Sequence, residues 1–251
     1  MTHTPLISII SATYNAEKYL QTSINSILLQ TYKNFEYIVI DGGSKDYTRK
    51  IILNNKGSIA YWISERDSGI YDAWNKGLTQ ARGEWIVFLG ADDQLLPDAL
   101  QNYVDFINNN SKLDFDYISS RVKRILPNGT VEGIVGKPWI WKEFKFRMTV
   151  AHPGSFHSRK LFEKYGNYNT NFKIVSDYEI LLRPKSELKA GYINKITVLM
   201  STGGKFDAFN ATKEVISMFK TSNHLSTVQY YVHKYNLYLR FFIGNLLTKI
   251  L

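Results

Sequence analysis

The chain has 251 residues and no cysteine, which excludes disulfide bonds, thiolate-bound metals and cysteine nucleophiles. No uninterrupted apolar run reaches the roughly 20 residues that a transmembrane helix requires. The sequence predicts no secretory leader, because residues 2–5 (THTP) lead directly from Met1 into a short apolar run. The sequence therefore predicts a protein that stays in the cytoplasm.

Acidic residues are in the minority, and the formal net charge is +9. A balance of this kind predicts an anionic partner, such as a phospholipid surface or a phosphorylated small molecule. Nucleic acid is not expected, since the basic residues are spread along the chain and no recognition motif accompanies them. A hydrophobic content of 44% is enough for a sizeable core.

Residues 5–110 alternate between two kinds of apolar segment. Short runs of β-favouring residues indicate strands, and segments with apolar residues at helical spacing lie between them. Predicted strands are 6–10, 35–40, 59–63 and 85–89; predicted helices follow Asn15 and Ser44 as N-caps, cover 70–81 and begin near Pro97. This order predicts an α/β fold with a parallel, doubly wound sheet and right-handed crossovers.

The second half of the chain is less regular. Strands are predicted at 115–119 and 192–200, a hairpin over 122–131, and short helices at 158–165 and 176–182. Residues 136–156 have no clear periodicity and are predicted to form a long functional loop. We expect a catalytic domain at 1–209, with a donor half at about 5–110 and an acceptor half at about 111–209, and a helical extension at 210–251.

The stretch 84–93 (EWIVFLGADD) combines a buried strand with a pair of acids. Its apolar run predicts a strand covered on both faces, and Asp92 and Asp93 follow at its carboxyl end. Open α/β sheets bind their ligands beyond the carboxyl ends of the strands. A polar loop before the next helix is the alternative, but it leaves the paired carboxylates unexplained.

Five motifs follow one another in the chain, at residues 7–15 (ISIISATYN), 38–44 (IVIDGGS), 65–77 (ERDSGIYDAWNKG), 90–93 (GADD) and 176–183 (SDYEILLR). Together they resemble the family 2 glycosyltransferases of the bacterial surface-polysaccharide type, which have the GT-A fold. That fold is a Rossmann-like sheet flanked by helices. The resemblance covers roughly residues 5–204, and an ordered set of motifs is more specific than any single one.

The resemblance implies a metal-dependent hexosyltransferase that uses a nucleotide-diphosphate sugar and Mn²⁺ or Mg²⁺. A hard cation held by carboxylate oxygen stabilises the charge that develops on a diphosphate leaving group. By the same resemblance, Asp93 is the metal ligand and Asp92 holds the ribose. The motif here is Ala-Asp-Asp instead of Asp-x-Asp, so we expect weak metal affinity.

The nucleoside pocket of the family corresponds to the ends of the first two strands. Thr13, Tyr14 and Asn15 begin the turn after the first strand, and Asp41 can accept a hydrogen bond from a uracil ring nitrogen. These residues are predicted to bind a uridine nucleotide. A turn formed by Asp41 with the two glycines that follow it is the alternative.

Charged residues of the third motif are expected to flank the donor. This group consists of Arg66, Asp67, Asp72 and Lys76, which are similar to residues beside donor sites in the family. Asp72 and Lys76 are one helical turn apart and share a face. The alternative is a solvated helix surface whose charges pair with each other.

On the acceptor side, the resemblance implies that Asp177 is the general base of a single, inverting displacement. The alternative for Asp177 is an ordinary first-turn carboxylate after a Ser176 N-cap. Arg183 is expected to orient a carboxylate or phosphate. His152 is expected to contact the acceptor, although a loop histidine with a satisfied ring is equally compatible with the sequence.

The last segment, residues 230–251, is apolar over a wide arc of a predicted helix. Such a helix either packs on the catalytic domain or lies in a membrane interface. Membrane contact would suit a lipid-linked saccharide acceptor, and it would make the protein peripheral on the inner face of the cytoplasmic membrane.

The sequence thus predicts an inverting glycosyltransferase that uses a UDP-sugar, in synthesis of O-antigen, capsule or exopolysaccharide. One alternative is a sugar-nucleotide nucleotidyltransferase, which would require a glycine-rich phosphate loop after the first strand. Residues 11–15 (SATYN) contain no glycine. The other alternative is a non-catalytic carbohydrate- or membrane-binding module on the same fold.

Overall fold

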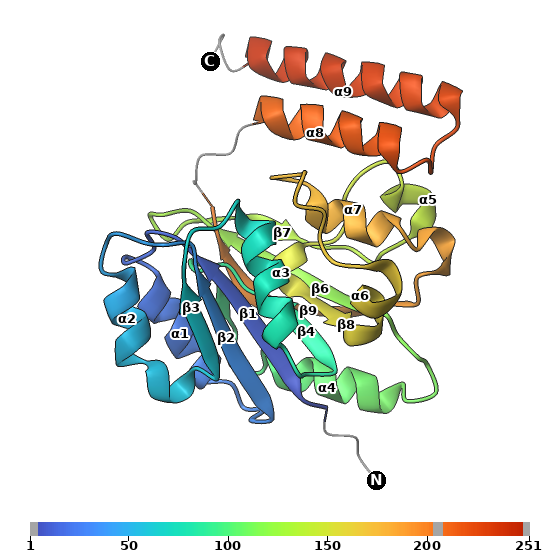
Figure 1. The fold of residues 1–251 in the computed structure, drawn as a ribbon. Helices are drawn as coiled ribbons and strands as arrows, with labels where there is room; N and C mark the ends of the chain where they lie inside the picture. The colour runs from blue at the N-terminus through green and yellow to red at the C-terminus, as the bar shows by residue number, and fades with distance from the viewer. Residues whose placement is uncertain (1–4, 203–207, 248–251) are drawn as a thin grey trace.

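The computed structural model describes residues 5–202 and 208–247, with side chains described as far as residue 239 (Figure 1). In this part of the chain nine strands form one sheet, in the order β3-β2-β1-β4-β8-β6-β9-β5, with β7 paired to β6. The strands are β1 (Ile7–Thr13), β2 (Phe35–Asp41), β3 (Tyr61–Ser64), β4 (Trp85–Phe88), β5 (Gln94–Leu95), β6 (Tyr117–Ile125), β7 (Val131–Val135), β8 (Ser155–Ser158) and β9 (Ala190–Ser201).

The first half is the predicted parallel sheet. Strands β3, β2, β1 and β4 are parallel neighbours, connected through α1 (Leu20–Leu28), α2 (Thr48–Asn54) and α3 (Ile70–Gln80). Because successive side chains of a strand point to opposite faces, Ile9 packs in the core on one side of the sheet and Ile10 in the core on the other. All four carboxyl ends therefore reach the same edge.

The second half continues the sheet in the antiparallel sense. β8 pairs antiparallel with β4, β6 pairs antiparallel with β8, and β9 runs parallel to β6. The predicted hairpin is present as β6 and β7, and its turn is closed by a 2.8 Å hydrogen bond from Gly129 N to Leu126 O. β5 directly follows the acidic pair and pairs with the carboxyl-terminal part of β9. This pairing brings the end of β9 beside the carboxyl end of β4.

Helices cover both faces of the sheet (Figure 1). One core contains buried side chains of α1, α2 and α4 (Ala99–Asn109). The other contains side chains of α3, α5 (Trp141–Phe144), α6 (Arg159–Tyr165) and α7 (Ser176–Leu182). The predicted loop at 136–156 holds α5, a short 3-10 turn at His152–Gly154 and the start of β8.

Two predicted helix starts were wrong. α1 begins at Leu20 instead of directly after Asn15, and α2 begins at Thr48 instead of after Ser44. Asn15 has a φ of 47° and joins two loops: its N–H donates to Ser44 Oγ, and its side-chain oxygen accepts from Lys45 N. Asn15 and Ser44 therefore connect the turn after β1 to the turn after β2 instead of capping helices.

The predicted C-terminal helices are α8 (Ala208–Thr221) and α9 (Thr227–Leu247). Figure 1 shows them side by side along the top of the molecule, over the side that carries α5 and α7. Met218 and Phe219 of α8 are buried against the core of that side, and Leu237 of α9 packs against it. Among the described helices, none has the length and apolar character needed to cross a membrane.

Candidate active site

The acidic turn after β4 is held in place by the end of β9. Ser201 N donates to Asp93 Oδ1 over 3.1 Å, and the Ser201 hydroxyl donates to the backbone oxygen of Asp92 over 2.6 Å. A Cβ atom at Gly90 would lie 2.8 Å from Asp93 Oδ2 and 3.1 Å from Asp92 Oδ1. The missing side chain at Gly90 therefore leaves room for one oxygen of each carboxylate to approach the same point.

The electrostatics of this turn favour a cation. Asp93 is 5% exposed, and its burial, together with the charge of Asp92, raises its pKa to about 7. Hydrogen bonds from the backbone N–H groups of Ser201 and Gly90 oppose that rise. Two hard carboxylate groups that converge on one turn fit a divalent metal that takes its other ligands from a diphosphate. Within the described residues no group of three or more His, Asp or Glu side chains is placed to hold a metal.

The residues predicted to bind the nucleoside differ in their surroundings. Asp41 is fully buried at the end of β2, where its carboxylate accepts hydrogen bonds from Ser44 N and from the hydroxyls of Ser44 and Ser64. Its carboxylate thus fixes the turn, as the alternative interpretation of the sequence expects. Direct contact with a uracil ring stays a prediction for Asp41.

Tyr14 and Asp67 are brought together around Gly42. A Cβ atom at Gly42 would lie 2.6 Å from Asp67 Oδ2 and 3.4 Å from the Tyr14 ring. Tyr14 is 64% exposed, whereas Thr13 is buried and its backbone oxygen accepts from Gly42 N. An exposed ring beside a carboxylate offers a stacking surface and a hydrogen-bond acceptor for a nucleoside.

The charged residues near α3 interact mainly with one another. Asp72 Oδ2 accepts from Ser68 N over 2.9 Å at the start of α3, which is an N-terminal capping contact. Lys76 Nζ lies 2.7 Å from Glu65 Oε1 and 3.8 Å from Asp72 Oδ2. The structure brings these predicted residues together, and their mutual pairing matches the alternative of a solvated surface. The Arg66 side chain is exposed beside them.

Asp177 lies in the first turn of α7, held from two directions. Its Oδ1 atom is 2.9 Å from the Tyr71 hydroxyl and accepts from Tyr178 N over 2.9 Å. Burial raises the pKa of Asp177 to about 6, and the Tyr71 hydrogen bond opposes that rise. A carboxylate with this pKa is ionised at neutral pH and basic enough to take a proton from a hydroxyl.

A cavity of about 290 Å³ opens at Asp177. Its walls come from α7, from residues 146–148 and from both C-terminal helices, and Met148, Val215 and Leu237 form much of its apolar side. The C-terminal helices therefore help to shape the space next to the predicted base.

Arg183 and His152 both make contacts within the protein. The guanidinium of Arg183 uses all three nitrogens, on the Glu179 carboxylate and on the backbone oxygens of residues 165 and 167. His152 is buried, its ring stacks on Trp74 at 4.7 Å between centroids, and burial lowers its pKa to about 3. Both side chains therefore stabilise the loops around α3 and α7, and their contacts with a substrate stay predictions.

Sequence reasoning missed two residues that position the candidate site. Tyr71 lies inside the third motif, but its hydrogen bond reaches Asp177, which is 106 residues further along the chain. Ser201 directly follows the predicted strand 192–200 and bonds to the acidic pair more than 100 residues earlier. Neither contact has a local signal, since both depend on how the sheet places distant segments.

Comparison with solved structures defines the class of protein. Staphylococcus aureus TarS (residues 1–349) in complex with UDP-GlcNAc matches with a TM-score of 0.72 at 18% identity, over 94% of this chain and 72% of that chain. The mannosyltransferase PcManGT from Pyrobaculum calidifontis, in complex with GDP-Man and Mn²⁺, matches with a TM-score of 0.66 at 17% identity, over 90% and 66%. The fold is that of the GT-A glycosyltransferases.

Sequence comparison places the protein more narrowly. The chain belongs to glycosyl transferase family 2, whose model matches residues 8–166. A PGL/p-HBAD biosynthesis glycosyltransferase of Mycobacterium bovis (strain BCG / Pasteur 1173P2) is 29% identical over 229 residues, which cover 88% of this chain and 86% of the relative. An uncharacterized glycosyltransferase of Mycobacterium tuberculosis (strain ATCC 25618 / H37Rv) is 32% identical over 186 residues, 73% and 70% of the two chains. The protein is a glycosyltransferase.

Proposed function

We propose that this chain is an inverting glycosyltransferase that moves a sugar from a UDP-sugar to a hydroxyl of a saccharide or lipid-linked saccharide. The observation that carries the proposal is Asp177, a half-buried carboxylate at the edge of a cavity, whose pKa is raised to about 6. A uridine donor is supported by the resemblance of the first two motifs and by the TarS complex with UDP-GlcNAc. The PGL/p-HBAD relative supports a role in building a cell-surface glycan, such as O-antigen, capsule or exopolysaccharide.

In the proposed reaction Asp177 takes the proton of the acceptor hydroxyl. The acceptor oxygen attacks the anomeric carbon from the side opposite the diphosphate, and the bond between the anomeric carbon and the diphosphate oxygen breaks. A single displacement inverts the anomeric configuration and needs no nucleophile from the protein. The Tyr71 hydrogen bond keeps Asp177 ionised and directs its other oxygen, Oδ2, away from Tyr71.

We assign the divalent cation, Mn²⁺ or Mg²⁺, to the turn after β4. Asp93 Oδ2 would hold the ion. Asp92 lies beside Asp93, where it would bind the ribose or help to hold the ion. When bound, such an ion stabilises the negative charge on the leaving diphosphate. Asp93 as the one strong protein ligand implies weak affinity for the ion in the absence of the nucleotide.

Tyr14 and Asp67 are the residues we assign to the nucleoside, with Thr13, Asn15 and Asp41 shaping the turns that carry them. Asn15 links the loop after β1 to the loop after β2 through Ser44 Oγ and Lys45 N, and Asp41 holds Ser44 within the second loop. A nucleoside bound between these loops would meet a preformed surface. Arg66, Asp72 and Lys76 form the charged rim of this side.

We also propose that the exposed face of α9 contacts the surface of an anionic membrane. Val228, Tyr231, Val232, Tyr235 and Leu239 recur at helical spacing and are all exposed. The net charge of +9 suits anionic lipid. The inner face of the same helix packs on the catalytic domain, so a membrane-bound α9 would present the Asp177 cavity to a lipid-linked acceptor.

Donor turnover tests the proposed function. Release of UDP or GDP is measured across UDP-glucose, UDP-galactose, UDP-GlcNAc and GDP-mannose, with Mn²⁺ and with a chelator. We expect turnover with at least one UDP-sugar, and loss of that turnover in chelator. Binding of UDP-sugars without any turnover would instead favour the non-catalytic module. Family membership already argues against the nucleotidyltransferase alternative.

A further inference from the structure

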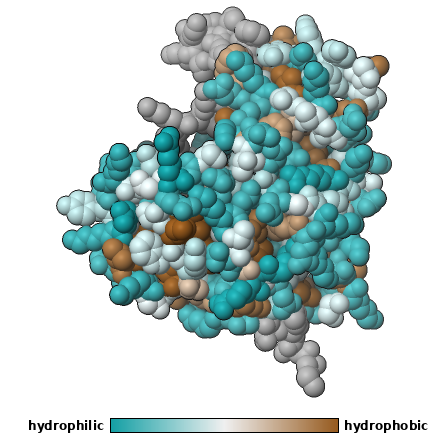
Figure 2. All heavy atoms as spheres, viewed as in Figure 1, coloured by the Kyte–Doolittle hydropathy of each residue, from teal (hydrophilic) through white to brown (hydrophobic). Residues whose placement is uncertain are grey.

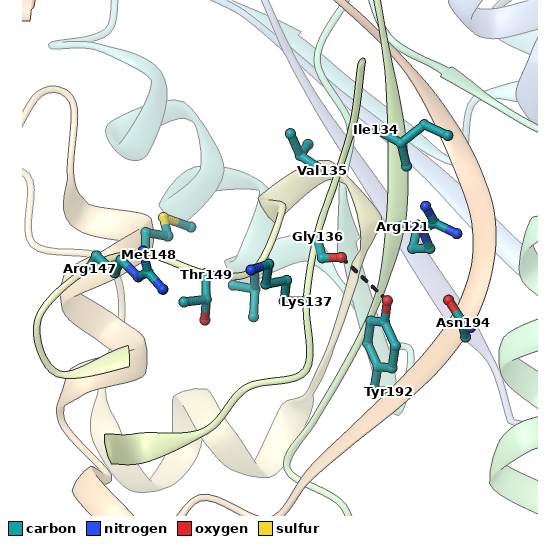
Figure 3. Close-up of a pocket in the computed structure, with 11 residues that line it drawn as sticks. Arg121, Ile134, Val135, Gly136, Lys137, Arg147, Met148, Thr149, Tyr192 and Asn194 are labelled. Atoms are coloured by element: carbon teal, nitrogen blue, oxygen red, sulfur yellow. Dashed lines mark hydrogen bonds between the residues drawn. The ribbon is translucent and has the colours of Figure 1, made fainter. Parts of the chain in front are cut away.

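A second cavity, of about 520 Å³, lies on the acceptor half of the molecule (Figure 3). It is formed by the β6–β7 hairpin, the start of β9 and residues 147–150. Its lining includes three cationic side chains, those of Arg121, Lys137 and Arg147, and no carboxylate. Figure 3 shows Arg121 on one side of the cavity and Arg147 on the other, with Lys137 between them. The cavity is therefore a positively charged depression.

The charges of these three residues are poorly compensated within the protein. Arg121 is half-buried, yet its guanidinium makes no hydrogen bond or ion pair with any residue of the described chain. The Lys137 ammonium likewise has no described partner, and only its backbone N–H is engaged, with Thr149 O. Arg147 pairs with Glu143 at 3.3 Å, and both side chains of that pair are exposed. Lys137 and Arg147 remain exposed to water, whereas Arg121 is half-buried without a partner, so an anionic ligand in the cavity would gain charge-assisted contacts.

The cavity adjoins the predicted base. Arg147 and Met148 line both this cavity and the cavity that opens at Asp177. A molecule bound across the shared wall would place one group among the cations and a hydroxyl near the Asp177 carboxylate. None of the residues of the Asp92–Asp93 turn lines this cavity, so it is separate from the place assigned to the donor diphosphate.

We propose that this cavity binds a phosphate group of the acceptor, so that the protein glycosylates a phosphate-bearing acceptor. The proposal rests on the proposed transferase function and on Asp177 as its base. Guanidinium groups bind phosphate oxygens in a bidentate manner, and Asn194 and Tyr192 add polar groups at the same wall. Ile134, Val135 and Met148 provide apolar contacts for the chain attached to the phosphate. A lipid diphosphate and a phosphodiester-linked glycan share this chemistry.

Calorimetric titration tests the proposal with two defined probes. Farnesyl diphosphate represents the lipid source and glycerophosphoglycerol the phosphodiester source, and both are titrated in saturating UDP and Mg²⁺ so that the donor site is filled. We expect at least one probe to bind. In Arg121→Ala/Lys137→Ala its affinity should fall by about tenfold or more, because two charge-assisted contacts are lost. The probe that binds with the higher affinity identifies the source of the phosphate.

Two controls separate local recognition from net charge and from misfolding. Lys33→Ala/Lys112→Ala removes the same two charges at exposed positions outside the cavity, and its affinity for the probe should equal that of the wild type. If the double variant melts at a lower temperature, Lys137→Ala alone gives the test, since that side chain is exposed. Absence of binding by both probes, or equal binding by wild type and variant, would overturn the proposal.

Failure of this proposal is distinguishable from failure of the proposed function. Hydrolysis of the donor by water needs no acceptor and does not use the phosphate cavity. Arg121→Ala/Lys137→Ala should therefore hydrolyse the donor at the wild-type rate. A wild-type protein that turns over no donor would refute the transferase function while the titration still reports on the cavity.

Discussion

Asp177 owes its basicity to opposing influences on one carboxylate. Burial raises its pKa, and hydrogen bonds from the Tyr71 hydroxyl and from backbone N–H groups lower it by stabilising the ionised form. The balance lies at about 6. Below that pH the carboxylate is increasingly protonated and cannot accept the proton of a hydroxyl, so turnover should fall as the pH decreases through this value.

Tyr71→Phe should shift that dependence. The substitution keeps the buried ring and removes the hydroxyl that stabilises the ionised Asp177, so the Asp177 pKa should rise. The acidic limb of donor turnover against pH should then move to higher pH. Tyr32→Phe is a matched control, because it deletes a buried hydroxyl bound to Pro5 O at 2.7 Å and far from Asp177 in the chain. An acidic limb that stays in place in Tyr71→Phe would contradict the assigned role of Tyr71.

Asp93→Asn tests the metal assignment without any catalytic assay. Mn²⁺ with UDP should raise the melting temperature of the wild type, because a ligand that binds the folded state stabilises it. The variant has lost the ionised oxygen that would hold the ion, so its melting temperature should rise much less. Asp98→Asn, an exposed carboxylate after the same strand, should behave as the wild type. Equal stabilisation of both variants would assign the ion elsewhere.

The residues predicted from sequence differ in how far their roles could be foreseen. The acidic pair and Asp177 lie in short motifs beside predicted element ends, so their location followed from local pattern. The roles of Asp41, His152 and Arg183 depend on partners that fold around them, such as Ser64, Trp74 and Glu179. Local sequence holds no information on those internal contacts, so it could not show that these side chains also hold the surrounding loops.

Besides its apolar packing, α8 contacts the active-site half through one acidic side chain. Glu214 of α8 accepts hydrogen bonds from Lys173 N over 2.9 Å and from Ile174 N over 2.8 Å, directly before α7. Ile174 O in turn lies 2.8 Å from the Tyr71 hydroxyl. A chain of contacts therefore runs from α8 through this segment to the residue that holds Asp177.

Glu214→Gln should loosen that segment. A neutral amide oxygen accepts hydrogen bonds less strongly than a carboxylate, and we expect a loss of about 1 kcal/mol of stability. Hydrogen exchange should become faster at the amides of residues 173 and 174, and it should be unchanged in β1. Glu163→Gln, at an exposed position of α6, provides the comparison. Unchanged exchange at residues 173 and 174 would show that Glu214 does not hold the segment.

Elements were predictable wherever periodicity was strong. Strands β1, β2 and β4 and helices α3, α6 and α7 lie within a few residues of their predicted positions, because each is punctuated by glycine, proline or an acidic turn. The starts of α1 and α2 were not predicted correctly, because Asn15 and Ser44 form a hydrogen bond with each other across two loops. The sheet position of β8 and β5 could not be predicted, since their pairing partners are distant in the chain.

At the scale of the whole molecule, the surface in Figure 2 is mainly hydrophilic, and hydrophobic residues emerge among polar ones over α8 and α9. The five exposed apolar residues of α9 form a continuous stripe by helical spacing. An exposed stripe of this length is unusual on a monomer and is typical of an interaction surface. Whether the catalytic domain is confined to residues 1–209 stays a prediction, although α8 begins at Ala208.

Substitution of two rings in that stripe tests membrane contact. Wild-type protein should sediment with vesicles that contain phosphatidylglycerol, and Tyr231→Ser/Tyr235→Ser should sediment markedly less, because each ring buries apolar area in the interface. Tyr19→Ser/Tyr47→Ser removes two equally exposed rings on the opposite half of the chain and should bind as the wild type. Equal sedimentation of the two variants would rule out α9 as the contact.

The assignment of Asp177 as the base is tested most directly by donor turnover in Asp177→Asn. The amide keeps the shape of the side chain and cannot accept the proton, so release of UDP should fall by about a hundredfold or more, while calorimetric affinity for UDP stays that of the wild type. Asp105→Asn, an exposed carboxylate on α4, should retain full turnover. Near-normal release of UDP by Asp177→Asn would contradict the proposed mechanism.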